Sequence, residues 1–361
     1  TGVDLVEWQL RVAFGEPLPK QQDQLKIHGH AIEARVYAEE PEKGFIPAIG
    51  QISYLHYPEQ NQHVRVDSGI VQGDEISTYY DPMIAKLIVW GENREAALLQ
   101  MHHALGQFHV DGLGNNIAFL DRIIRCNSFK NAKLDTNLIQ REDEFLFKNI
   151  QSLQPELVVA TALTELLLRF SKNKPASNPV WQSETLWRVN ISPSYAIKLK
   201  LDEALVQVNL SAEQEGFVAE YQGEKFHISG QLLNAHTAHF NINGKQAKIA
   251  FSQNAQGLTI FKNGQSHKFG YLNQKFSSED TQSTEGNLKA PMPGVITQVL
   301  VAANDQVKKD DVLMTLEAMK MEYSIRAPHD GIVAASYFQA GDQVKAGDEL
   351  VEFQALTEEV A

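Results

Sequence analysis

Ala290-Pro291-Met292-Pro293-Gly294-Val295 recurs 37 residues later as Ala327-Pro328-His329-Asp330-Gly331-Ile332. The same offset carries Asn304-Asp305-Gln306-Val307-Lys308 onto Gly341-Asp342-Gln343-Val344-Lys345. Two adjoining copies of a short all-β unit predict a pseudo-twofold β-sandwich of roughly 75 residues. The second pair of stretches differs only in its first residue. Because Asn is among the few residues that tolerate a positive φ as Gly does, we expect a turn there in both copies.

The stretch Glu317-Ala318-Met319-Lys320-Met321-Glu322 lies where the first copy must turn back into the second through a hairpin. The twofold repeat relates this hairpin to the end of the chain, so we expect Lys320 at an exposed tip opposite the termini. By itself Lys320 could be an ordinary solvated lysine. Met319 and Met321 argue against that interpretation, because exposed apolar side chains cost solubility and hairpin tips usually carry Asn, Asp or Gly.

The first part of the chain, residues 1–150, mixes two periodicities. Apolar and polar residues alternate over 32–39, which is typical of a half-buried strand. Apolar residues then recur every three or four positions over 97–108, after Gly91-Glu92-Asn93, which predicts an amphipathic helix. We therefore predict an α+β domain here and a multidomain α+β chain overall.

Residues 151–275 are predicted to form an antiparallel β-barrel around one long helix. Apolar residues cover most of the circumference of the helix expected over 156–170, so other elements must wrap it. About eight short alternating runs follow over 186–271, beginning with a run over 186–191. Between runs, Asn243-Gly244 and Asn263-Gly264 have the composition of two-residue hairpin turns.

Composition narrows the classes of protein that fit. A polar stretch over 276–288 predicts a flexible linker to the twofold unit, which we place at 289–356. The net charge of −13 argues against a nucleic-acid partner. No stretch is long and apolar enough to predict a membrane span, and the single cysteine, Cys126, favours a reduced compartment. Because the chain begins at Thr1 without Met or a leader, we expect a piece of a longer protein.

Ala318-Met319-Lys320-Met321, after the Ala-Pro-x-x-Gly start of the unit, resembles the biotin attachment site of biotin-dependent carboxylases. The resemblance implies that the ε-amine of Lys320 is joined to biotin by a biotin protein ligase, with Met319 and Met321 as part of the site. A lipoyl carrier domain is the nearest alternative, since it has a similar twofold β fold and a hairpin lysine. Lipoyl sites usually place Asp before the lysine, so the two methionines favour biotin.

The first 150 residues resemble the C-terminal part of a biotin carboxylase domain of the ATP-grasp superfamily. The matching stretches are Gly2-Val3-Asp4-Leu5-Val6-Glu7-Trp8-Gln9, Gly29-His30-Ala31-Ile32-Glu33-Ala34-Arg35 and Tyr80-Asp81-Pro82-Met83-Ile84-Ala85-Lys86-Leu87. By this resemblance, the residues that bind ATP, Mg²⁺ and bicarbonate lie upstream of Thr1. This piece alone is therefore not expected to catalyse the ATP-dependent step.

Two residues of this part receive roles from the resemblance. Val64-Arg65-Val66-Asp67-Ser68-Gly69 matches the stretch that holds the family's biotin-facing arginine, which assigns Arg65 to stabilising the biotin enolate. Without the resemblance, Arg65 would be read as a surface salt bridge with Asp67. Leu138 matches an apolar residue beside the adenine of ATP, although a buried leucine needs no ligand to explain it.

The order of carboxylase tail, helix in barrel and biotinyl domain resembles the α subunit of acyl-CoA carboxylases. Short segments favour the 3-methylcrotonyl-CoA enzymes of leucine degradation. The resemblance implies a barrel that docks a carboxyltransferase β subunit (a BT domain), a large α/β hetero-oligomer, and carriage of CO₂ on Lys320-linked biotin. Such a ligase would lie in the cytoplasm of a bacterium or the mitochondrial matrix of a eukaryote.

Other interpretations stay open at this point. A propionyl-CoA, geranyl-CoA or other acyl-CoA carboxylase would have the same module order. So would a non-catalytic carrier or scaffold module that only moves biotin between catalytic partners. A metal site is not expected, because His28 and His30, like His102 and His103, have no converging third ligand at suitable spacing.

Overall fold

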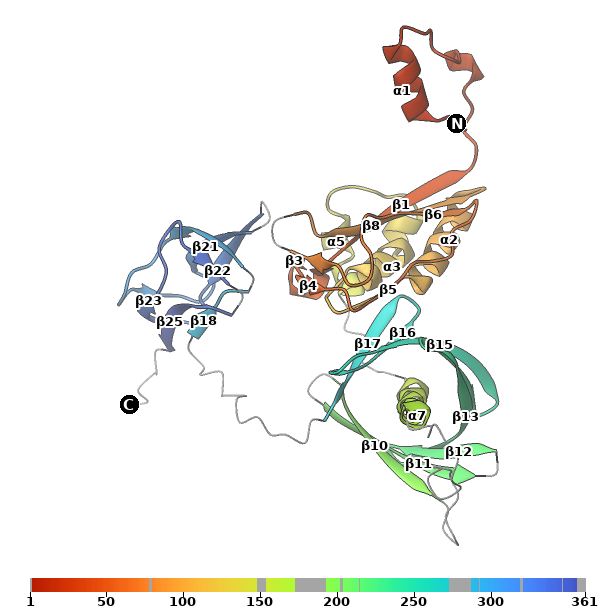
Figure 1. Ribbon diagram of the computed structural model, residues 1–361. Coiled ribbons are helices and arrows are strands. Elements are labelled where there is room, and N and C mark those ends of the chain that lie inside the picture. Colours follow the sequence, from red (N-terminus) through yellow and green to blue (C-terminus); the bar gives the residue numbers. More distant parts are fainter. Residues whose placement is uncertain are drawn as a thin grey trace.

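The computed structural model describes three modules of the chain (Figure 1). The described residues are 2–77, 80–147, 154–172, 193–201, 204–213, 215–272, 287–291, 293–318, 321–345 and 347–355. We call residues 2–147 the N-terminal module, 154–272 the barrel and 287–355 the sandwich, within those ranges. The predicted strand over 186–191 lies outside the described residues. None of the described helices is long and apolar enough to cross a membrane.

The N-terminal module is built on a three-stranded antiparallel sheet in the order β1-β8-β6. Its main strands are β1 (His30–Tyr37), β5 (Tyr54–His56), β6 (Val64–Asp67), β8 (Met83–Gly91) and β9 (His109–Asp111). The short pieces are β2 (Glu39–Glu40), β3 (Ile46–Pro47), β4 (Gly50–Gln51) and β7 (Glu75–Ile76). Burial alternates along β1, as the sequence predicts, so one face of the sheet enters the core and the other stays exposed.

The helices of this module are α1 (Leu5–Ala13), α2 (Arg94–Gln107), α3 (Ile117–Arg125), α4 (Asn127–Lys130), α5 (Leu138–Arg141) and α6 (Asp143–Leu146), with 3₁₀ turns η1 (Gln22–Gln24) and η2 (Pro41–Lys43). α2 and α3 pack against the sheet, whereas α1 has no buried residue and stands apart from the sheet in Figure 1. The predicted helix is confirmed as α2. Its N-cap is Asn93, whose side chain accepts a hydrogen bond from the amide of Ala96 at 2.9 Å, and Met101 and Leu105 are fully buried.

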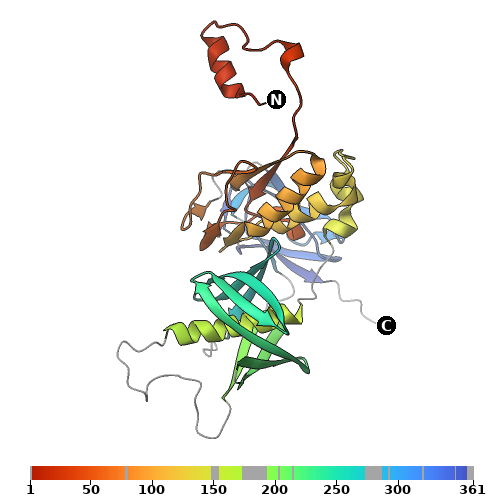
Figure 2. The ribbon, with the colours of Figure 1, turned by 90° about the vertical axis from the view of Figure 1, so that its right-hand side faces the viewer.

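The barrel closes around α7 (Pro155–Lys172), as Figure 2 shows. Its strands, in order, are β10 (Ser194–Leu201), β11 (Ala204–Glu213), β12 (Gly216–Tyr221), β13 (Glu224–Asn234), β14 (Thr237–Ile242), β15 (Lys245–Gln253), β16 (Gly257–Lys262) and β17 (Gln265–Tyr271). Neighbouring strands are antiparallel, and β10 pairs with β17 to close the ring. Positive φ at Asn243, Gly244, Asn263 and Gly264 confirms both predicted turns.

Polar groups on α7 are satisfied inside this apolar sleeve. Thr161 and Thr164 are fully buried, and each hydroxyl donates to the carbonyl four residues earlier. Glu165, 4% exposed, accepts from Arg169 Nε at 2.7 Å and from the Tyr271 hydroxyl at 2.8 Å. Burial raises the pKa of Tyr271 to about 12, so its hydroxyl keeps its proton and remains a donor at neutral pH. The helix is therefore held by hydrogen bonds as well as by apolar contacts.

The sandwich consists of two four-stranded sheets, ordered β18-β25-β23-β20 and β22-β21-β19-β24. The strands are β18 (Asn287–Lys289), β19 (Gly294–Val299), β20 (Gln306–Val307), β21 (Val312–Ala318), β22 (Met321–Arg326), β23 (Gly331–Ser336), β24 (Gln343–Val344) and β25 (Glu349–Ala355). β18 begins inside the predicted linker, because Leu288 pairs with Val351 and packs on the sandwich core.

Hydrogen bonds between the two copies confirm the twofold repeat. The amide of Asn304 donates to the carbonyl of Val333 at 2.7 Å, and 37 residues later the amide of Gly341 donates back to Ile296, also at 2.7 Å. Asn304 and Gly341 both have positive φ, at 73° and 97°, as the exchange of Asn for Gly predicts. The fold class is therefore confirmed: a multidomain α+β chain with a helix-centred barrel and a pseudo-twofold sandwich.

The N-terminal module packs on the barrel through β5 and β9, which lie beside the β16–β17 hairpin in Figure 1. His109 of β9 is 9% exposed and stacks on Phe261 of β16, with ring centroids 4.7 Å apart. Its Nε2–H donates to the carbonyl of Gly106 at 3.2 Å, whereas its buried Nδ1 has no partner among the described residues. An uncharged ring suits this contact.

His109 makes the stability of this contact depend on pH. Burial lowers the pKa of His109 to about 4, while the same ring in an unfolded chain has a pKa of 6.5. Between these values the unfolded chain binds the extra proton. The contribution of His109 to the free energy of unfolding is therefore fully present above about pH 6.5 and is lost as pH falls to about 4. This loss amounts to up to about 3 kcal/mol. His109→Phe should flatten this part of the profile in denaturant unfolding of the full chain across pH. An equally steep loss in the variant would contradict the role of His109.

Candidate functional site

The β21–β22 hairpin of the sandwich is the first candidate site. Its ladder pairs Glu317 with Glu322 and ends with Ala318 opposite Met321. Met319 and Lys320 themselves lie outside the described residues. Figure 1 shows the hairpin on the opposite side of the sandwich from β18 and β25. The backbone around the predicted lysine thus has the hairpin geometry that the sequence analysis expects.

The last pairs of this ladder have an unusual charge arrangement. Glu317 and Glu322 are both exposed and face each other directly across the two strands. Like charges in opposite positions destabilise a strand pair, so this pairing costs stability. Ala318, in contrast, is 6% exposed and closes the sandwich core beneath the turn. The last described pairs of the hairpin thus combine a buried Ala318 with two exposed carboxylates.

Arg65 lies on the exposed face of the N-terminal sheet. Its Nε and Nη2 donate to the two carboxylate oxygens of Asp67 at 2.7 and 2.8 Å, and its side chain is 71% exposed. Lys86 of β8 also approaches Asp67, at 3.4 Å. These two cations, Arg65 first, hold the pKa of Asp67 below its usual value. The ion pair with Asp67, which the sequence gave as the alternative role of Arg65, is therefore present. Both Nε and Nη2 of Arg65 take part in it.

A second arginine, Arg35, occupies the same face. Arg35 of β1 is opposite Lys86, and Lys86 is opposite Asp67, so the three positions form a row across the sheet. Its side chain is 63% exposed, and its contact with Glu33 is 3.4 Å long. Arg35 is thus held less tightly by a carboxylate than Arg65 is. The sequence analysis missed this residue, although Arg35 ends one of the matched stretches and falls on the exposed phase of the strand.

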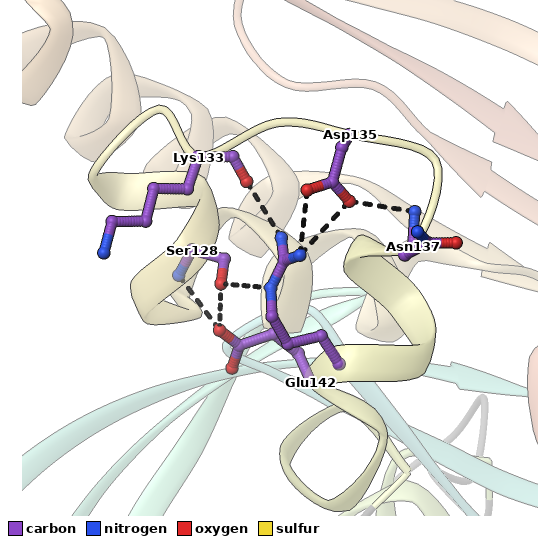
Figure 3. Close-up of polar contacts among 6 residues, drawn as sticks. Ser128, Lys133, Asp135, Asn137 and Glu142 are labelled. Atoms are coloured by element: carbon purple, nitrogen blue, oxygen red, sulfur yellow. Dashed lines mark hydrogen bonds and ion pairs between the residues drawn. The ribbon is translucent and has the colours of Figure 1, made fainter.

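Leu138 is the first residue of α5 and is 8% exposed. Arg141 anchors the turn before it, because its Nη1 donates to both oxygens of Asp135 at 3.2 and 2.9 Å and its Nε donates to Ser128 Oγ at 3.3 Å. Glu142 accepts from the amide and hydroxyl of Ser128 at 3.0 and 2.5 Å, as Figure 3 shows. Leu138 therefore has a structural reason for its burial.

The predicted residues do not form one cluster. Arg65 and Leu138 belong to the N-terminal module, whereas the hairpin belongs to the sandwich, which meets that module at Ile46 of β3. Among the described residues, no group of three or more His, Cys, Asp or Glu side chains is arranged to hold a metal ion. Cys126 is buried and unpaired. The chemistry of this chain thus depends on bringing separate parts together.

Comparison with known proteins identifies two of the modules. Residues 33–141 match the family profile described as "Biotin carboxylase C-terminal domain", and residues 286–353 match "Biotin-requiring enzyme". The chain thus carries a biotin carboxylase C-terminal domain and a domain of the biotin-requiring enzymes. In this protein, the biotin carboxylase domain supplies the sheet with Arg35 and Arg65, and the biotin-requiring domain supplies the β21–β22 hairpin.

Named relatives are α subunits of acyl-CoA carboxylases. The chain is 37% identical over 340 residues to the methylcrotonoyl-CoA carboxylase subunit alpha, mitochondrial, of Dictyostelium discoideum, which covers 90% of this chain and 48% of the relative. It is 34% identical over 343 residues to the propionyl-CoA carboxylase alpha chain, mitochondrial, of Sus scrofa, covering 90% and 46%. The chain therefore spans about half the length of the curated relatives it matches.

Among solved structures, the biotin carboxylase domain of a thermophilic 2-oxoglutarate carboxylase bound to bicarbonate is 38% identical to this chain. The match covers 40% of this chain and 33% of that one, with a TM-score of 0.39.

Leu138 offers a test that needs no nucleotide. Because the side chain is 8% exposed, Leu138→Ala should lower the free energy of unfolding of this chain by about 2–3 kcal/mol in denaturant titrations. The neighbouring Ile139 is 39% exposed, so Ile139→Ala is the matched control and should cost less than about 1 kcal/mol. Equal, small losses for both variants would contradict a contribution of Leu138 to the packing of this module.

Proposed function

We propose that this chain is the C-terminal portion of the α subunit of a biotin-dependent acyl-CoA carboxylase. The observation that carries the proposal is the joint presence of a biotin carboxylase domain and a biotin-requiring domain on either side of a helix-centred barrel. In the intact protein, upstream residues would bind ATP, Mg²⁺ and bicarbonate. Biotin attached to Lys320 would carry CO₂ from that site to a carboxyltransferase.

Each module has a part in this function. The β21–β22 hairpin would present Lys320 to a biotin protein ligase and afterwards to two active centres. Met319 and Met321 would give the ligase and the carboxylase an apolar surface beside the amine. Leu138, at the start of α5, would border the adenine of ATP. The barrel would hold a carboxyltransferase β subunit, as the carrier needs a second centre at which to deliver CO₂.

The acyl-CoA substrate is proposed from the relatives. We propose 3-methylcrotonyl-CoA, which is supported by the 37% identity to the Dictyostelium discoideum methylcrotonoyl-CoA protein. Five other methylcrotonoyl-CoA relatives are 29–33% identical, which overlaps the 31–34% of two propionyl-CoA proteins. A propionyl-CoA or geranyl-CoA carboxylase is the alternative within the class. A carrier that only moves biotin is the alternative outside it. The names of these relatives include "mitochondrial", which fits a eukaryotic source; a bacterial protein would lie in the cytoplasm.

The exposed face of the β1-β8-β6 sheet is proposed to meet biotin. A fixed guanidinium there can stabilise negative charge on the ureido oxygen better than mobile water can, because its orientation is set in advance. Arg65 is the residue that the sequence assigns. Arg35 is the structural alternative on the same face, since its carboxylate contact is longer than that of Arg65; its guanidinium also interacts with the Tyr37 side chain.

The attachment of biotin to Lys320 can be tested by mass spectrometry. Intact-mass analysis after co-expression with a biotin protein ligase should show one biotin on this chain and none on Lys320→Arg, because an arginine side chain cannot form the amide. Lys345→Arg, on the same module at an exposed position, is the matched control and should carry biotin normally. Biotin that persists on Lys320→Arg, or lipoate in place of biotin on the unaltered chain, would refute the assignment.

The two arginines can be separated in the full-length parent. Replacing the guanidinium that faces biotin by Ala should slow biotin carboxylation on the order of 100-fold, while bicarbonate-dependent ATP turnover falls much less. Arg65→Ala and Arg35→Ala are compared with Arg125→Ala, an exposed ion-paired arginine on α3. A selective loss in Arg65→Ala supports the sequence prediction, and one in Arg35→Ala transfers the role to that residue. Equal loss of both reactions in both variants would contradict a role for this face in biotin chemistry.

A further inference from the structure

One face of the β5–β9 ribbon of the N-terminal module contacts the barrel through Tyr54, His109 and Asp111. Its register pairs Tyr54 with Asp111 and His56 with His109 on one side. Leu55 and Val110, on the other side, pack into the core of the N-terminal module. Strand alternation thus divides this two-stranded ribbon into a core face and a face made of polar and aromatic side chains.

A buried hydrogen bond joins this face to the barrel. The hydroxyl of Ser252 on β15 donates to Asp111 Oδ2 at 2.6 Å, and the two residues are 4% and 2% exposed. The residues are 141 positions apart in the sequence. A buried carboxylate costs free energy unless it is hydrogen-bonded. Separating Ser252 from Asp111 is therefore unfavourable unless water replaces the lost hydrogen bond.

Aromatic rings surround that hydrogen bond. Tyr54 stacks on His236 with centroids 4.4 Å apart and lies 5.7 Å from Phe261. His109 also stacks on Phe261, with centroids 4.7 Å apart. Phe261 is therefore in contact with two rings of the N-terminal module. Contacts of this kind have defined geometry, and each contributes roughly 0.5–1.5 kcal/mol beyond apolar burial.

Backbone contacts extend the boundary beyond the ring cluster. The carbonyl oxygen of Leu105, at the end of α2, lies within 4 Å of a Cβ built on Gly264 in the β16–β17 hairpin. Gly264 has a φ of +75°, and the hairpin turn reaches the N-terminal module without a side chain in between. The contact thus combines a directional hydrogen bond, ring stacking and close backbone approach, which together oppose both sliding and separation.

We propose that the N-terminal module and the barrel act as one rigid body in the intact α subunit, with Ser252 and Asp111 as positioning residues. The inference rests on the proposed function. If the barrel holds the carboxyltransferase subunit, this contact sets the separation of the two active centres between which Lys320-linked biotin must move. The biotin-requiring domain, which meets the N-terminal module at Ile46, is then the part that travels.

Hydrogen exchange on the present chain tests the rigid contact without any assumption about function. In Ser252→Ala, the Asp111 carboxylate loses its buried donor, so amides of β9 and β15 should exchange about 10-fold faster or more. Asp111→Asn keeps an acceptor oxygen for Ser252 and should retain most of the protection. Ser211→Ala, on β11 of the same barrel, is the matched control and should leave both strands unchanged. Unaltered exchange in Ser252→Ala would overturn the rigid body.

Activity of the assembled α/β enzyme tests the positioning role. Ser252→Ala should reduce overall acyl-CoA carboxylation about 5- to 10-fold, while carboxylation of free biotin, ATP turnover and biotin content of Lys320 stay within about twofold of the unaltered protein. The ratio of the two reactions is the readout, because a general loss of folding lowers both equally. An equal fall in both would leave Ser252 a supporter of the fold and overturn the positioning role. Absence of biotin on the unaltered chain would instead refute the proposed function.

Discussion

The apolar circumference of α7 is the constraint on which the architecture of the central module depends. A helix with Val158, Leu163 and Leu166 buried cannot be covered by a single sheet face, so eight strands close around it. Closure leaves no strand edge exposed and gives the barrel a curved outer surface. The β15 and β16 strands on that surface carry the residues that meet the N-terminal module. The packing of one helix therefore determines where two neighbouring modules join.

Much of this fold follows from local sequence patterns. Asn243-Gly244 and Asn263-Gly264 predict hairpin turns because both positions need a positive φ, and the structure has them there. The twofold sandwich follows from the 37-residue repeat, and Asn304 in place of Gly341 marks a turn in both copies. The end of the linker does not follow so simply. Asn287 and Leu288 lie in a polar stretch, yet they pair with β25, because strand pairing over long distances overrides local composition.

The candidate site was predictable in part. The hairpin around Lys320 follows from the repeat, and its described strands, β21 and β22, pair as expected. The role of the lysine stays a prediction. Arg65 shows the limit of motif matching: its partner Asp67, two residues along the strand, was foreseeable, but the shared face with Arg35 depends on the register of three strands. The Ser252–Asp111 hydrogen bond has no signal in a single sequence, since it joins strands of two modules 141 residues apart.

The hydrogen bonds of Glu165 with Arg169 and Tyr271 have a consequence for the position of α7 inside the barrel. Apolar contact is non-directional, so a barrel interior with apolar side chains alone would let the helix rotate or slide along its axis at little cost in free energy. Arg169 lies on α7 itself, so it holds the Glu165 carboxylate within the helix, whereas the Tyr271 hydroxyl of β17 donates to that carboxylate from the barrel wall. Because a hydrogen bond requires a defined geometry, this single contact opposes rotation and sliding of α7 relative to β17.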